Sequence, residues 1–194
     1  EKKDIIDFGM GNPDMPTPLH IRQKLKETID KPGVGRYSVS RGIIGLRKAQ
    51  SNYYKRRFNV DLDYNKEIIV TIGSKEGLAN LAQAITSRGD KILCPDPSYP
   101  VHPYGFMIAG AKLIPLKTLF NGLFDQVKYL TKVDSYLKKN SLIKAIIVSF
   151  PSNPSAQVVG LDFYKDLVKI AKKYNIYILS DLADSEIYFD DNPP

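Results

Sequence analysis

The chain contains few of the residues that form disulfides and metal centres. It has one cysteine and two histidines among its 194 residues. The single cysteine, Cys94, excludes an internal disulfide framework and is typical of a reducing compartment such as the cytoplasm. The two histidines, His20 and His102, are too few for a histidine-rich metal centre, so we expect no metal site.

Long apolar runs are also absent. No stretch approaches the roughly 18 consecutive apolar residues of a membrane-spanning helix. The chain starts with Glu-Lys-Lys-Asp, which does not resemble the apolar core of a secretory signal. With 43% hydrophobic and 25% charged residues, the composition is that of a globular protein with a sizeable core. We therefore expect a cytoplasmic protein with no membrane partner.

Basic residues outnumber acidic ones by 28 to 21, which gives a formal net charge of +7. Much of the excess lies in residues 22–57, whereas the end of the chain, with Asp190 and Asp191, is acidic. A basic surface could attract nucleic acid or phosphorylated ligands. The basic residues are spread among helically spaced apolar positions, which is typical of solvated helix faces, so we expect no nucleic-acid partner.

Strands and helices alternate along most of the chain. Short β-branched runs predict strands at 68–72, 91–94, 111–115, 144–149 and 176–180. Helical spacing predicts helices at 18–31, 42–58, 75–87, 101–109, 126–139 and 160–174. Repeated strand–helix units predict an α/β fold with a mostly parallel sheet and helices on both faces. Ligands of such sheets bind beyond the carboxyl ends of the strands.

The first strand end of interest is Gly73-Ser74-Lys75, where a helix begins directly after a strand. Backbone N–H groups at a helix start, with a serine hydroxyl, suit a phosphate. The alternative is that Ser74 only caps the helix. The motif is not a Walker loop, and no Gly-x-Gly-x-x-Gly occurs in the chain.

Three other strand ends carry candidate ligand groups. Asp181 follows an apolar strand and needs a positive partner, such as a protonated ring nitrogen, unless it only braces a loop. Asn153 could donate to a ligand oxygen or simply form a turn, and Tyr99 could stack on a flat ring or belong to the core. Together with a phosphate seat, these groups are the set that pyridoxal 5′-phosphate requires.

At these residues the chain resembles the class I aminotransferases, which are fold type I pyridoxal-phosphate enzymes. The phrases that carry the resemblance are Gly9-Met-Gly-Asn-Pro-Asp-Met-Pro, Arg36-Tyr-Ser-Val-Ser-Arg-Gly, Thr71-Ile-Gly-Ser-Lys-Glu-Gly, Pro95-Asp-Pro-Ser-Tyr-Pro and Ser149-Phe-Pro-Ser-Asn-Pro. The branch it is most similar to contains the alanine and LL-diaminopimelate aminotransferases. The resemblance implies the large domain of the aspartate aminotransferase type, in residues 46–194 and incomplete at its C-terminal side. Residues 1–45 would form an N-terminal arm and the start of the small domain.

The resemblance also implies which residues bind the cofactor. Ser74 and Lys75, with Gly73, would hold the phosphate, and Tyr99 would stack on the pyridine ring. Asn153 would donate to the ring oxygen O3′. Asp181 would pair with the protonated ring nitrogen and is the catalytic residue that this chain would supply. Family members carry tyrosine three residues after this aspartate, whereas this chain has Asp184.

Other implied roles concern the substrate and a second subunit. The backbone of Gly11 and Asn12 would lie near the substrate carboxylate, and Tyr37 would reach the cofactor phosphate of a neighbouring subunit in a homodimer. The reaction would move an amino group between an amino acid and a 2-oxo acid. The family's Schiff-base lysine would lie beyond the position of Pro194, so we expect the N-terminal portion of an aminotransferase. The alternative is a truncated, catalytically inactive remnant.

Overall fold

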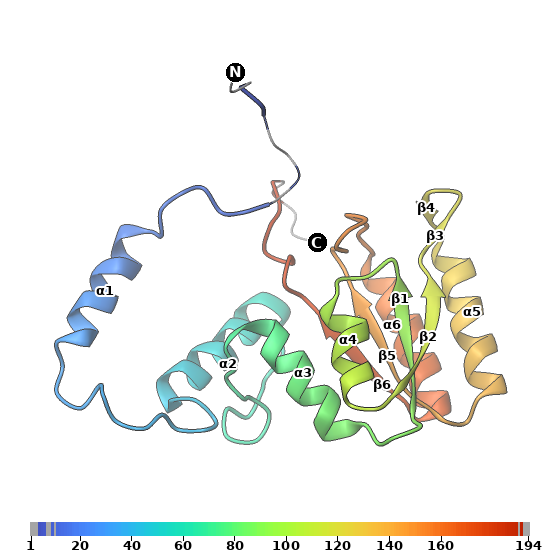
Figure 1. Cartoon of the computed structure of the whole chain (residues 1–194), viewed down its shortest axis with the longest axis horizontal. Coiled ribbons are helices and arrows are strands. Elements are labelled where there is room, and N and C mark those ends of the chain that lie inside the picture. The colour runs from blue at the N-terminus through green and yellow to red at the C-terminus, as the bar shows by residue number, and fades with distance from the viewer. Residues whose placement is uncertain (1–3, 7–8, 10, 190, 192–194) are drawn as a thin grey trace. The chain divides into compact units, whose positions relative to one another are not determined.

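The computed structural model describes residues 4–6, 9, 11–189 and 191 (Figure 1). It divides the chain into two compact units, Glu1–Tyr64 and Asn65–Pro194, which are described separately below. Met10 of the first family phrase and Asp190 of the acidic end lie outside the described residues. The predicted division after residue 45 refers to domains of a complete enzyme and stays a prediction.

The N-terminal unit contains the helices α1 (Leu19–Ile29) and α2 (Ile44–Phe58). Helix α1 begins after Pro18, and no side-chain hydrogen bond caps it. Helix α2 is tied to the segment that follows it by Arg47, which is 6% exposed. The Arg47 guanidinium donates to the carbonyl oxygens of Gly42 at 3.1 Å and Tyr64 at 2.6 Å.

The C-terminal unit is built on a four-stranded parallel sheet in the order β2-β1-β5-β6 (Figure 1). Its strands are β1 (Lys91–Asp96), β2 (Lys112–Lys117), β5 (Ile143–Ser149) and β6 (Tyr177–Asp181). Its helices are α3 (Gly73–Ile85), α4 (Val101–Ile108), α5 (Gln126–Lys139) and α6 (Leu161–Tyr174). These elements confirm the predicted parallel α/β fold. A short hairpin of β3 (Leu119–Phe120) and β4 (Leu123–Phe124) was not expected. Within the described ranges, no helix combines the length and apolarity needed to cross a membrane.

The predicted strand at 68–72 is wrong. These residues belong to no strand, and only Ile68 is buried, whereas Ile69 and Ile72 are 64% and 91% exposed. A β-branched run forms a strand only where a neighbouring strand completes the backbone hydrogen bonds. None of the described strands pairs with this segment.

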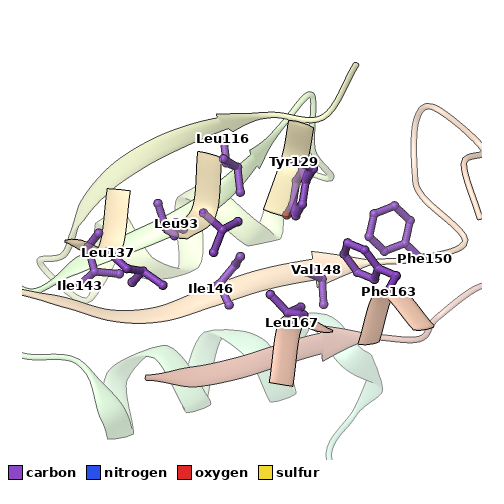
Figure 2. Close-up of a cluster of buried hydrophobic side chains, with 11 residues drawn as sticks. Leu93, Leu116, Tyr129, Leu137, Ile143, Ile146, Val148, Phe150, Phe163 and Leu167 are labelled. Carbon is purple, nitrogen blue, oxygen red and sulfur yellow. The ribbon is translucent and has the colours of Figure 1, made fainter. Parts of the chain in front are cut away.

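Successive residues of the strands face opposite sides of the sheet, and each side has its own core. On one side, Ile92 and Ile147 pack with Ala82 of α3 and Phe106 of α4. On the other side the core belongs to α5 and α6 (Figure 2). Its labelled members are Leu93, Leu116, Tyr129, Leu137, Ile143, Ile146, Val148, Phe150, Phe163 and Leu167. Helices therefore cover both faces, as predicted.

Aromatic rings form one end of the α5–α6 core. Phe163 of α6 is fully buried, and its ring centroid lies 5.3 Å from Phe150 and 5.7 Å from Tyr129. Phe124 of the hairpin joins the group at 5.8 Å from Phe163. Because Phe150 directly follows β5, this packing also fixes the loop that leaves that strand.

Replacing Phe163 with alanine is expected to lower the free energy of unfolding by about 3–5 kcal/mol, because it removes the ring at the centre of this group. Chemical denaturation of the chain, followed by circular dichroism, measures the change. Val127→Ala on α5 is the control, since Val127 is 73% exposed and its truncation should cost at most about 0.5 kcal/mol. Equal effects of the two substitutions would contradict the central place of Phe163.

Candidate functional site

A cavity of about 190 Å³ lies where the strands of the parallel sheet end. Its lining comprises Ser74, Lys75, Tyr99, Ser149, Asn153, Asp181, Ala183 and Asp184. Five of the residues predicted to bind a cofactor therefore share one cavity, although they are spread over 108 positions from Ser74 to Asp181. The site lies at the carboxyl ends of the strands, as the fold rule predicts.

The pairing of β5 with β6 places the two strand ends side by side. Ser149 is the register partner of Asp181, and both are the last residues of their strands. The loop after β5 carries Asn153, and the loop after β1 carries Tyr99. The three neighbouring strands therefore deliver an amide, a phenol ring and a carboxylate to the same edge of the sheet.

Asp181 is 8% exposed and has a partner for each carboxylate oxygen. Its Oδ2 lies 2.9 Å from Nε2 of His102, and its Oδ1 accepts a hydrogen bond from the backbone N–H of Ala183 at 3.1 Å. The hydrogen bond from His102 lowers the pKa of Asp181 below its ordinary value, although burial acts in the opposite direction. The structure therefore holds this carboxylate in its ionised form, which is the form that attracts a protonated ring nitrogen.

His102 was not expected in the site. Its side chain is fully buried on α4, and its ring centroid lies 6.2 Å from that of Tyr99. The only signal in the sequence was a histidine three residues after Tyr99 within an otherwise mostly apolar helix. Nothing in the pattern linked it to an aspartate 79 residues away.

Ser74 does not cap α3, so the alternative of a purely capping role is wrong. Ser74 lies inside the helix, Ile72 precedes it as the N-cap, and no side chain caps the helix from that position. The N–H of Ile72 instead donates to the carboxylate of Glu76. Gly73 has φ +77°, a conformation that costs other residues strain, and no atom lies within 4 Å of where its Cβ would be. Gly73 and Ser74 are both exposed at this helix start.

Helices α3 and α4 pack closely against each other. A Cβ on Gly105 of α4 would lie 3.6 Å from Cα of Ala79 of α3, so the two backbones are in close contact. At the start of the same pair of helices, Nζ of Lys75 lies 5.4 Å from the ring centroid of Tyr99. The predicted phosphate seat and the predicted ring platform are therefore parts of one packed block.

Asn153 is exposed on a loop closed by its own hydrogen bonds. The backbone N–H of Ser152 donates to the carbonyl of Gln157 at 2.9 Å, and that of Ala156 donates to the carbonyl of Ser152 at 2.7 Å. The Ser155 hydroxyl adds a bond of 3.0 Å to Ser152. These bonds fix the loop without using the Asn153 amide, which is left to line the cavity.

Three predicted residues lie in the other unit. Gly11, Asn12 and Tyr37 all belong to the N-terminal unit, where they are exposed. Their roles in substrate binding and in a partner's site stay predictions.

The fold and the cavity define a parallel α/β protein in which a serine and a lysine at a helix start, an aromatic ring and a buried carboxylate line one cavity. The family described as Aminotransferase class I and II matches residues 3–193. The chain therefore belongs to this family, whose members are pyridoxal-phosphate-dependent enzymes.

Two curated relatives are similar over nearly the whole chain. The glutamate-pyruvate aminotransferase AlaC of Escherichia coli is 46% identical over 97% of the chain, which spans 45% of AlaC. The LL-diaminopimelate aminotransferase of Aquifex aeolicus is 44% identical over 98% of the chain, which spans 48% of that enzyme. The chain thus spans about half the length of the curated relatives it matches, in agreement with the expected portion of an aminotransferase.

A solved structure supports the expected fold type. An aspartate aminotransferase of Thermus thermophilus, a tetra mutant, has a TM-score of 0.78 and 26% sequence identity. The match covers 89% of this chain and 46% of that one. The large-domain fold of the aspartate aminotransferase type is therefore confirmed, in partial form.

Replacing His102 with leucine is expected to raise the pKa of Asp181 above its value in the unmodified chain. The substitution removes the hydrogen bond that lowers this pKa but leaves the burial that raises it. Ionised Asp181 stabilises the unmodified fold above the ordinary pKa of 3.8, and this contribution is lost as the pH falls through the lowered pKa. In the variant the buried ionised carboxylate keeps only the hydrogen bond from Ala183 and destabilises the fold at neutral pH, so the difference in stability between the two proteins should shrink as the pH falls.

Carboxyl-selective ¹³C NMR titration measures the shift of Asp181 directly. Asp134 is the internal control, because its pKa is lowered by the hydrogen bond from Lys173 and should stay the same in the variant. An unchanged Asp181 midpoint in His102→Leu would show that His102 does not control this carboxylate.

Proposed function

We propose that this chain forms the cofactor-binding portion of an aminotransferase that moves an amino group between an amino acid and a 2-oxo acid. The observation that carries the proposal is the shared cavity, in which Ser74, Tyr99, Asn153 and Asp181 meet. The residues fit pyridoxal 5′-phosphate because each side of that molecule finds a matching chemical group. When bound, its protonated pyridine ring supplies an electron sink.

Each lining residue then has a separate task. The Ser74 hydroxyl and the open backbone at Gly73 would donate to the phosphate, and the Lys75 ammonium would add a positive charge. The ring of Tyr99 would stack on the pyridine face, and the Asn153 amide would donate to O3′. Asp181 would hold the proton on the ring nitrogen, and His102 would keep Asp181 ionised and oriented.

The substrates and the assembly follow from the relatives rather than from the cavity. The names of AlaC and of the Aquifex enzyme support a glutamate–pyruvate or an LL-diaminopimelate type of reaction. In this proposal Gly11 and Asn12 lie near the substrate carboxylate, and Tyr37 reaches the cofactor phosphate of the second subunit of a homodimer. A cytoplasmic location agrees with Cys94, which is buried and free.

A second candidate is a non-catalytic remnant of an aminotransferase that binds phosphate-bearing ligands. The observation that favours it is Asp184, a second carboxylate in the cavity where the family carries a tyrosine. The resemblance implies that this tyrosine donates a hydrogen bond to the ring oxygen of the cofactor, and an ionised carboxylate cannot donate such a bond. The two candidates predict polypeptides of different length and different cofactor content in the cell.

Intact mass of the protein purified from its natural source is expected to distinguish them. For a working aminotransferase, the chain should be longer than 194 residues and should gain a reduced pyridoxyl phosphate after treatment with borohydride. Peptide mapping would then place the adduct on a lysine outside this sequence. A mass equal to these 194 residues, with no adduct, would favour the remnant.

Asp181→Asn in the complete enzyme is expected to lower the transamination rate by at least about 100-fold, because an amide cannot hold the proton on the ring nitrogen. Steady-state kinetics measure the loss, and thermal unfolding shows whether the fold is intact. Asp166→Asn is the matched control, since Asp166 pairs with Lys169 on the surface of α6. Near-normal turnover by Asp181→Asn would exclude the role assigned to this residue.

A further inference from the structure

The cavity contains a second carboxylate that the fold does not use. Asp184 lines the cavity together with Asp181 and is only partly exposed. Both oxygens of Asp181 are engaged, by His102 and by the backbone of Ala183. In the described part of the chain, no hydrogen bond or ion pair involves the Asp184 side chain, and only its backbone carbonyl is bound, by the N–H of Ile187 at 3.1 Å.

The turn after β6 holds Asp184 in place without help from its side chain. The backbone N–H of Ser185 donates to the carbonyl of Leu182 at 3.1 Å, and the Ser185 residue itself is buried. Asp181 at the start of the turn is fixed by His102. These bonds position the backbone at Asp184, and no partner among the described residues competes with a ligand for its carboxylate.

An unpaired carboxylate selects among ligands by charge. In its ionised form it accepts hydrogen bonds and donates none, so it favours a cationic donor and disfavours an acceptor. The cationic residue of the lining is Lys75, which belongs to the predicted phosphate seat at the start of α3. The phosphate of a bound cofactor would neutralise the charge of Lys75. The Asp184 carboxylate would then interact with the other groups of the cofactor.

The forms of the cofactor differ in one ring substituent, which is an amine in one form and an aldehyde in the other, and the Asp184 carboxylate would interact differently with the two. All share the phosphate, the ring nitrogen and the ring oxygen. The amine form carries an aminomethyl group, which is a cationic donor, whereas the aldehyde form presents an acceptor at the same position. We propose that Asp184 is a specificity-determining residue that makes this cavity favour the amine form, pyridoxamine 5′-phosphate. This inference rests on the function proposed above and deepens it.

Equilibrium binding to the chain tests the inference without any need for turnover. The two probes are pyridoxamine 5′-phosphate and pyridoxine 5′-phosphate, which carries a neutral hydroxymethyl group and does not react with lysines. Isothermal titration calorimetry gives both dissociation constants. The unmodified chain is expected to prefer the amine probe by roughly two- to fivefold, the size of effect typical of one partly exposed charge pair.

Three variants complete the test. Asp184→Asn, which keeps the shape of the side chain and removes its charge, should bring the ratio of the two constants close to one. Asp184→Tyr, which introduces the hydroxyl of the family, should also lower the ratio by improving binding of the neutral probe. Asp162→Asn is the matched control, because this side chain is 85% exposed on α6 and pairs with Lys165. It should leave the ratio unchanged.

The outcomes separate this inference from the proposed function. If the unmodified chain binds both probes and Asp184→Asn does not change their ratio, the inference is wrong and the proposed function stands. If the unmodified chain binds neither probe, the cofactor site itself fails on this chain, and the inference fails with it. Asp181→Asn should raise the dissociation constants of both probes by the same factor, because both probes carry the same ring nitrogen.

Discussion

The parallel pairing of β5 with β6 is the constraint on which the site depends. Its register runs from Ala145 opposite Tyr177 to Ser149 opposite Asp181, so both strands end at the same level. Side chains of a strand alternate between the two faces, and a slip of one residue would turn Asp181 to the opposite face of the sheet. His102 could then no longer reach it. The register of β5 and β6 therefore determines the geometry of the site.

The α3–α4 side of the sheet serves both as core and as support for the site. Leu179 of β6 belongs to the core on this side, and Asp181 follows two residues later on the same face. The carboxylate thus emerges at the end of an apolar row, where burial without a partner would be costly. His102 resolves this conflict because α4 already packs on this face through Phe106. Asp184 lines the same cavity but is partly exposed, so its carboxylate does not need a buried partner.

Local patterns predicted most of the elements, and their failures have identifiable causes. Apolar runs located β1, β2, β5 and β6 to within a few residues, because each run also had partners in the sheet. The run at 68–72 has the same composition but no partner strand among the described residues, and it forms none. Ser74 was open to interpretation as a helix cap, because a sequence does not show whether a helix begins before or after a given serine.

The sequence by itself determined the fold class, the family and five residues of the cavity. Those conclusions rest on short-range order, since motif spacing and apolar periodicity are properties of neighbouring positions. Only the tertiary structure decided that His102 binds Asp181, that Ser74 is not a cap, and that Asp184 lines the cavity with no side-chain partner among the described residues. Each of these depends on contacts between segments far apart in the chain or on the exact start of a helix. Local sequence patterns predict neither, because both are set by packing between distant segments.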